Sequence, residues 1–81
     1  SAEPLTESQR TRVKNAEILL KLNSAACLLM LTRYEDVITV CTEVLELEPG
    51  NFKAIYRRGV AKLRMQLYEE ALEDLIQAQR K

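Results

Sequence analysis

The chain matches itself when it is shifted by 34 residues, and this internal period constrains its fold more than any other feature. Apolar residues then fall on apolar residues, and small residues fall on small ones. The superposed pairs are Ala25 and Gly59, Ala26 and Val60, Leu29 and Leu63, Tyr34 and Tyr68, Val37 and Ala71, Ile38 and Leu72, Cys41 and Leu75, and Val44 and Ala78. A fixed period of this length is typical of proteins in which each repeat is one supersecondary unit that packs on the next. We therefore predict two tandem copies of one unit.

Each unit is predicted to be a pair of helices, because apolar residues recur at helical spacing in four segments. Thr6 and Gln9 match a capping box, so the first helix should begin at Glu7 and continue to about residue 31. Thr32 and Glu35 match a second capping box and predict the start of the second helix. The expected core stripes are Ile18, Leu22, Ala25 and Leu29 with Leu19, Ala26 and Leu28; Tyr34, Val37, Ile38, Cys41, Val44 and Leu45; Ile55, Tyr56, Gly59, Val60 and Leu63; and Tyr68, Ala71, Leu72, Leu75, Ile76 and Gln79.

The boundary between the two units is marked by Pro49 and Gly50, which should stop the second helix. Asn51 can cap a third helix over about residues 52–65, and a fourth is expected from residue 68 to near residue 80. Glycine in a helix interior costs about 1 kcal/mol relative to alanine. We therefore expect Gly59 to permit a close approach of two helices, with Ala25 in the same role one repeat earlier.

The composition agrees with a helical chain, since 47% of the residues are apolar, 30% are charged, and only two glycines and two prolines are present. We predict an all-α fold of two tandem helix-turn-helix repeats, a piece of an α-solenoid with an extended first helix. Residues 1–5 are assigned to a tail or linker, residues 6–48 to the first repeat and residues 51–81 to the following repeat.

The charges cancel over the whole chain but separate along it. Twelve basic and twelve acidic residues leave no net charge to attract nucleic acid or an anionic membrane, so neither is expected as a partner. The first helix of each pair is basic and the second is acidic. The apolar region from Ala16 to Leu31 is interrupted by Glu17, Lys21 and Asn23, so it should not span a bilayer.

The sequence carries no catalytic or metal-binding pattern, and we expect neither enzymatic activity nor a cofactor. Histidine is absent, which removes the usual general base and the commonest metal ligand. The spacing of Cys27 and Cys41 matches no zinc motif. Both are expected to be buried free thiols, compatible with a reducing compartment such as the cytoplasm.

The third helix carries cations where they oppose its own stability. Lys53 lies in the first turn, where the helix dipole disfavours positive charge, and Arg57 follows one turn later as a like-charged neighbour. No acidic residue occurs from Asn51 to Gln66, so the pair can seat a carboxylate-bearing ligand. On this helix alone, a solvated basic face is the favoured interpretation, and Arg58 and Lys62 could either extend a basic groove or face solvent.

The 34-residue period, the helix-turn-helix unit and the order of small residue, tyrosine, small residue and proline resemble the tetratricopeptide repeat. The matching residues are Ala25, Tyr34, Val37, Cys41, Val44 and Pro49 in one repeat and Gly59, Tyr68, Ala71, Leu75 and Ala78 in the next. The sequence departs from the family pattern where Val37 and Val44 replace alanines and Lys62 replaces an aromatic residue.

A narrower resemblance is to the carboxylate-clamp class of these domains, found in co-chaperones and in large FKBP-type immunophilins. It rests on Leu-Asn-Ser-Ala-Ala-Cys-Leu-Leu at residues 22–29 and on Lys-Ala-Ile-Tyr-Arg-Arg-Gly at residues 53–59. The resemblance implies that Asn23, Lys53 and Arg57 grip the carboxylates of an EEVD-type C-terminal peptide of Hsp90 or Hsp70. It also implies that any prolyl isomerase activity of an immunophilin parent resides in a separate domain. The alternative that stays open is a repeat scaffold that binds another protein without a clamp.

The clamp of this class also uses a lysine and an asparagine from a preceding repeat, and Lys14 and Asn15 lie on the wrong helix to replace them. We therefore expect the chain to be part of a larger domain. Repeat stacks usually need three or more units for stability, so we also expect self-association or helix exchange between copies.

Overall fold

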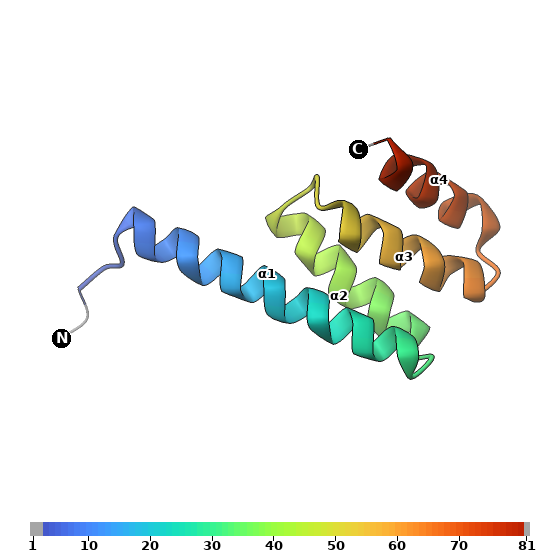
Figure 1. The fold of residues 1–81 in the computed structure, drawn as a ribbon, viewed down its shortest axis with the longest axis horizontal. Helices are drawn as coiled ribbons and strands as arrows, with labels where there is room; N and C mark the ends of the chain where they lie inside the picture. The colour runs from blue at the N-terminus through green and yellow to red at the C-terminus, as the bar shows by residue number, and fades with distance from the viewer. Residues whose placement is uncertain (1–2, 81) are drawn as a thin grey trace.

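Four helices joined by short turns form the chain in a computed structural model, which describes residues 3–80. They are α1 (Glu7–Met30), α2 (Tyr34–Leu47), α3 (Phe52–Arg64) and α4 (Tyr68–Gln79), and Figure 1 shows them in order along the chain. The described residues form no strand. The prediction of an all-α chain with four helices is confirmed.

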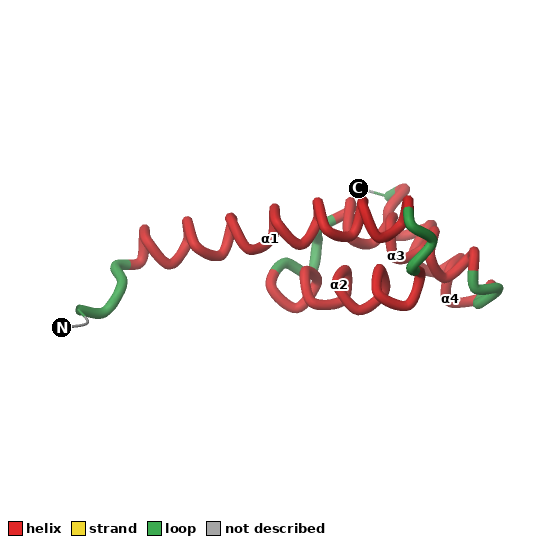
Figure 2. The backbone as a smooth tube through the Cα atoms, turned by 90° about the horizontal axis from the view of Figure 1, so that it is seen from below, coloured by secondary structure: helices red, strands yellow, loops and turns green. Residues whose placement is uncertain are grey.

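The helices stack in chain order as two helical hairpins. α1 packs on α2, α2 on α3 and α3 on α4, while α1 also contacts α3. The first helices of the two hairpins are therefore neighbours, which is the arrangement of an α-solenoid of the tetratricopeptide type. The N-terminal half of α1 extends beyond the other three helices (Figure 2), so the molecule is elongated, with extents of 50 × 27 × 13 Å. The predicted repeat fold with a long first helix is confirmed.

Helix starts are set by side-chain caps in two of the four cases. The Thr6 and Gln9 capping box forms as predicted, with each side chain accepting the other residue's backbone N–H, at 3.0 and 2.8 Å. Asn51 Oδ1 accepts the backbone N–H of Ala54 at 3.0 Å and caps α3. Helices α2 and α4 start without a side-chain cap.

The predicted second capping box, of Thr32 and Glu35, is wrong. Thr32 has φ of 58°, and its backbone belongs to the C-terminal end of α1. The N–H groups of Thr32 and Arg33 bond the carbonyls of Leu29 and Leu28, a Schellman motif that ends the helix. The Thr32 hydroxyl donates to the carbonyl of Leu31 and does not cap α2.

The same turn recurs 34 residues later, so the two repeats share their backbone conformation as well as their sequence pattern. Gln66 has φ of 65°, and the N–H groups of Gln66 and Leu67 bond the carbonyls of Leu63 and Lys62. Both left-handed positions are occupied by residues with a Cβ atom, and Thr32 is β-branched, which makes its conformation the more strained of the two.

Replacing Thr32 by glycine should relieve this strain. We expect Thr32→Gly to raise the free energy of unfolding by about 1 kcal/mol, because the left-handed conformation costs a residue with a Cβ atom about 1–2 kcal/mol and the larger unfolded-chain entropy of glycine offsets only part of this gain. Urea unfolding followed by circular dichroism measures the difference. Thr39→Gly, at an exposed position inside α2, should instead lower stability, and a loss of stability in both variants would contradict the assignment.

The core lies where α1, α2 and α3 meet. Its buried members are Ile18, Leu22 and Ala25 from α1, Val37, Cys41 and Val44 from α2, and Ala54 and Ala61 from α3. Cys41 is a buried free thiol as predicted, and burial raises its pKa to about 11. Cys27 is exposed, so its predicted burial is wrong.

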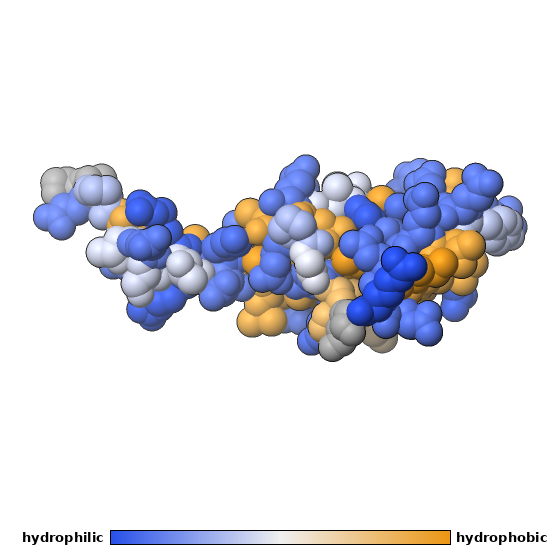
Figure 3. All heavy atoms as spheres, turned by 90° about the horizontal axis from the view of Figure 1, so that it is seen from above, coloured by the Kyte–Doolittle hydropathy of each residue, from blue (hydrophilic) through white to orange (hydrophobic). Residues whose placement is uncertain are grey.

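Several other residues of the expected stripes are also exposed. Leu19 lies on α1, whose C-terminal half is apolar on most of its circumference although one side packs on α2. Tyr56 and Leu63 on α3, and Tyr68, Leu72 and Ile76 on α4, are exposed as well. Figure 3 shows such apolar surface among hydrophilic side chains over the stack, whereas the projecting end of α1 is mostly hydrophilic. Apolar periodicity therefore predicted more buried area than the described chain contains.

Gly59 lies on α3 where side chains of α4 pack tightly against it. A Cβ atom placed on Gly59 would be 3.0 Å from the Cβ atom of Asp74 and 3.0 Å from the side chain of Leu75. The predicted close approach is confirmed, and Ala25, the equivalent residue of α1, is fully buried. The methyl group of Ala25 fits at its position in the first repeat, whereas at Gly59 in the second repeat only a hydrogen atom fits.

Gly59→Ala should destabilise the chain by about 1–3 kcal/mol, because the clash exceeds the gain of about 1 kcal/mol in helix propensity. Gly50→Ala is the matched control, since nothing lies within 4 Å of a Cβ atom built there. The free energies of unfolding in urea compare the two. If Gly59→Ala were the more stable variant, the close packing of α4 on α3 would be incorrect.

Candidate binding site on the first helices of the two hairpins

The start of α3 places two of the predicted site residues. Asn51 caps the helix through the N–H of Ala54 and also donates from Nδ2 to Glu48 Oε1 at 2.7 Å, which ties the cap to the end of α2. Lys53 then lies in the first turn of α3 and is exposed, and Arg57 lies one turn later and is half-buried. The cap thus fixes the position of both cations.

Arg57 reaches from α3 to α1. Its Nη1 donates to the backbone carbonyl of Leu22 at 2.9 Å, a contact between residues 35 positions apart. Asn23 directly follows Leu22 and is exposed on α1. The structure therefore brings the guanidinium of Arg57 to the stretch of α1 that carries Asn23.

Lys53 and Arg57 line one hollow between α3 and α4, with a volume of about 540 Å³. Its other lining residues are Phe52, Tyr56, Leu75, Ala78 and Gln79. No acidic side chain lines it, and within residues 3–80 neither Lys53 nor Arg57 forms an ion pair. Asn23 lies outside this lining. The hollow is a mostly apolar site that carries two positive charges, which suits an anion attached to an apolar group.

The other cations in the middle of α3 are neutralised by α4. Arg58 bonds Asp74 with two parallel contacts, Nε to Oδ2 at 2.8 Å and Nη2 to Oδ1 at 2.9 Å, and donates from Nη1 to Thr42 Oγ1 at 3.2 Å. Lys62 Nζ lies 3.1 Å from Asp74 Oδ2 and 3.6 Å from Glu70 Oε1. Arg58 and Lys62 thus belong to an ionic network that joins α2, α3 and α4, and they do not extend a basic groove.

Asp74 is the centre of this network and is only 4% exposed. Desolvation by burial raises its pKa, but hydrogen bonds from Arg58 and Lys62 and the charges of both cations outweigh this effect. The net result is a pKa below the ordinary value of 3.8. The same carboxylate raises the pKa of Arg58 by accepting its hydrogen bonds.

The sequence contains a signal for Asp74 that our prediction did not use. Asp74 interrupts the stripe between Ala71 and Ala78 with a charge, at a position that should be buried. Arg58 and Lys62, one turn apart on the preceding helix, could have been matched to it.

Replacing Asp74 by asparagine should lower the free energy of unfolding by about 3 kcal/mol, since Arg58 and Lys62 would keep their charges in a buried site without a carboxylate. Chemical unfolding followed by circular dichroism measures the loss. Asp36→Asn is the matched control: Asp36 pairs with Arg33 at 2.7 Å at the surface, so its replacement should cost less than about 1 kcal/mol. Equal losses in the two variants would show that Asp74 is not held as described.

The same pairing predicts a pH dependence. The pKa of Asp74 is lower in the folded state than in the unfolded state. Its contribution to the free energy of unfolding is therefore fully present above the unfolded-state pKa and is lost as the pH falls through the folded-state pKa. Stability of the unchanged chain should therefore decrease below about pH 4 more steeply than that of Asp74→Asn. Parallel curves for the two proteins would contradict this.

Comparison with known proteins places the chain beside segments of longer proteins. No protein-family model matches it. It is 43% identical over 56 residues to peptidyl-prolyl cis-trans isomerase PASTICCINO1 of Arabidopsis thaliana, 46% over 57 residues to human FK506-binding protein-like and 35% over 68 residues to human sperm-associated antigen 1. These matches cover 69%, 70% and 84% of this chain.

The same matches cover 9%, 16% and 7% of the three relatives, so the chain spans less than a fifth of the length of each. PASTICCINO1 is named as a prolyl isomerase and a second relative as FK506-binding protein-like, which agrees with the predicted resemblance to FKBP-type immunophilins. Within the described residues, no helix is both long enough and apolar enough for a membrane span. The chain is thus an all-α, repeat-type segment similar to short parts of FKBP-type proteins and of sperm-associated antigen 1.

Proposed function

We propose that the chain is a non-catalytic protein-interaction module of the tetratricopeptide co-chaperone class. In this proposal Asn23, Lys53 and Arg57 bind the acidic, EEVD-type C-terminal peptide of Hsp90 or Hsp70. The observation that carries the proposal is the hollow between α3 and α4, in which Lys53 and Arg57 meet apolar walls and no acidic side chain. A peptide that ends in aspartate offers the matching groups, because its last residue carries both the main-chain carboxylate and a side-chain carboxylate.

The three side chains have complementary roles in the proposed clamp. Arg57 uses one N–H to bond the carbonyl of Leu22, which holds its planar fork in place and leaves other donors for a carboxylate. Lys53 is exposed and supplies a mobile point charge. Asn23 supplies a donor and an acceptor for the peptide backbone from α1.

The affinity should come mainly from the two cations. Hydrogen bonds to charged groups contribute about 1.5–3 kcal/mol each, so losing one cation should weaken binding by about ten- to a hundredfold. The apolar walls, which include Tyr56 and Leu75, would bury an aliphatic side chain of the peptide. Because the class uses two further clamp residues from another repeat, this chain should bind more weakly than a complete clamp.

The relatives support an adaptor role within a longer protein. Two of them carry names of FK506-binding or prolyl isomerase proteins, and this chain matches a small part of each. We propose that the chain links a cytoplasmic chaperone to a parent protein whose isomerase domain, where present, is separate.

Binding of a labelled peptide that ends in Glu-Glu-Val-Asp, measured by fluorescence anisotropy, tests the clamp. We expect Lys53→Ala and Arg57→Ala each to raise the Kd at least about tenfold, and amidation of the peptide C-terminus to do the same. Arg64→Ala is the matched control, because it removes an exposed cation from the same helix outside the hollow.

Unchanged affinity in Lys53→Ala and Arg57→Ala would refute the clamp. If the chain bound the amidated and the free peptide equally, the alternative function would be favoured, a repeat scaffold that binds another protein. The mostly apolar lining of the hollow would then be the binding surface itself.

A further inference from the structure

The hollow between α3 and α4 is larger than an EEVD-type peptide needs. Its volume is about 540 Å³, within the range of about 300–1,000 Å³ that is typical of sites for small organic ligands. In such a peptide the residue before the C-terminal aspartate is valine, which has a short side chain. Valine therefore leaves most of the hollow unfilled, and apolar walls that stay in contact with water add nothing to the affinity.

The walls of the hollow suit a large apolar side chain. Phe52 and Tyr56 line it from α3, and Leu75 and Ala78 line it from α4. Tyr56 is 54% exposed and Phe52 is 39% exposed, so both rings offer surface to an incoming group. Burial of apolar area and contact with aromatic rings both favour a bulky ligand side chain over a short one.

Ala78 keeps the hollow wide. It has the smallest side chain of the lining residues and lies on α4 about one turn after Leu75. A larger residue at position 78 would occupy part of the hollow itself. The size of this side chain should therefore set the size of the group that the hollow accepts.

The two cations decide which residue of a bound peptide reaches these walls. Lys53 and Arg57 line the same hollow as Tyr56. In the proposed function they hold the carboxylates of the last residue. Successive residues of an extended peptide lie about 3.3–3.6 Å apart, so the residue before the terminal aspartate is the next one along and brings its side chain to the walls.

We propose that the hollow selects C-terminal peptides in which a large apolar residue, such as leucine or phenylalanine, precedes the terminal aspartate. This inference rests on the proposed function, because Lys53 and Arg57 must hold the terminal carboxylates. Ala78 determines the specificity by leaving space, and Tyr56 supplies a wall. Each methylene group that is buried raises the affinity about fourfold. Leucine in place of valine should therefore lower the Kd about fourfold, and phenylalanine should lower it at least about tenfold.

Three labelled peptides that end in Glu-Glu-Val-Asp, Glu-Glu-Leu-Asp and Glu-Glu-Phe-Asp test the preference by fluorescence anisotropy. With the unchanged chain, the Kd should decrease in that order. Equal Kd values, or tightest binding of the valine peptide, would overturn this inference, and the clamp would stand if amidation still weakened all three peptides. Binding that ignored amidation would refute the clamp and this inference with it.

A ring placed inside the hollow should abolish the preference. With Ala78→Phe the three Kd values should agree within about twofold, because the new side chain takes the space of the ligand side chain. Gln77→Phe is the matched control, since it adds the same ring at the neighbouring exposed position outside the lining, and it should keep the preference. Far-UV circular dichroism checks that both variants are helical. A preference retained in a helical Ala78→Phe would overturn the proposal.

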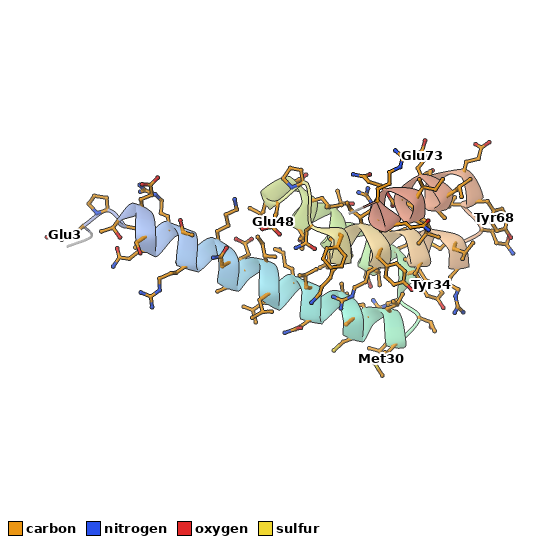
Figure 4. The ribbon with its side chains drawn as sticks, turned by 45° about the horizontal axis from the view of Figure 1, so that its top comes forward. Glu3, Met30, Tyr34, Glu48, Tyr68 and Glu73 are labelled. Atoms are coloured by element: carbon orange, nitrogen blue, oxygen red, sulfur yellow. The ribbon has the colours of Figure 1, made fainter. Side chains whose placement is uncertain are left out.

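A second pair of variants removes a ring from an exposed position and tests the same wall without altering a buried residue. Tyr56→Ala should raise the Kd of the phenylalanine peptide at least about fivefold more than that of the valine peptide. Tyr68→Ala is the matched control, because Tyr68 is exposed, does not line the hollow and points away from the stack (Figure 4). It should leave all three Kd values unchanged. Equal effects of the two tyrosine variants on the phenylalanine peptide would contradict the proposed specificity.

Discussion

Asp74 is held between Arg58 and Lys62 in the seam of the second hairpin, and the position of α4 depends on this contact. In α4 the only buried residues are Ala71 and Asp74, whereas α2 buries Val37, Cys41 and Val44. Helix α4 therefore contributes few fully buried apolar side chains to the second hairpin. A buried carboxylate tolerates desolvation only with its partners in place, so the network also selects the register in which α4 lies against Gly59.

The same network divides the cations of α3 between two tasks. Arg57 and Arg58 are neighbours in the sequence, but successive residues of a helix point about 100° apart. Arg58 faces Asp74 and its charge is balanced, whereas Arg57 faces α1 and the hollow that it shares with Lys53. An overall basic helix thus presents a small, defined positive site. This separation makes a specific anion a better candidate ligand than a diffuse acidic surface.

Much of the fold was predictable because the same helix-turn-helix pattern occurs twice in the sequence. The 34-residue period, the Thr6 cap, the Asn51 cap and the close approach at Gly59 all depend on local chemistry or on small residues, and each agrees with the structure. The prediction of a capping box at Thr32 failed because backbone hydrogen bonds to the carbonyls of Leu28 and Leu29 hold this residue in the C-terminal turn of α1 despite its strained φ. The predicted burial of Cys27 was wrong because α1 is apolar on most sides, and the sequence does not indicate which side is covered by other helices.

The candidate site was predictable in part. The sequence places Lys53 and Arg57 one turn apart on a helix without acids, and the resemblance adds Asn23; the role of all three as ligand-binding residues remains a prediction. The contact of Arg57 with Leu22 and the apolar walls of the hollow join residues from different helices, so neither could be read from spacing.

The sequence by itself determined where the helices lie, how they repeat and which of them are basic or acidic, because these properties follow from neighbours a few residues apart. The tertiary structure alone decided which cations are paired, which apolar faces are covered and which stay open. Those outcomes depend on the distance between side chains far apart in the chain, which packing sets and composition does not.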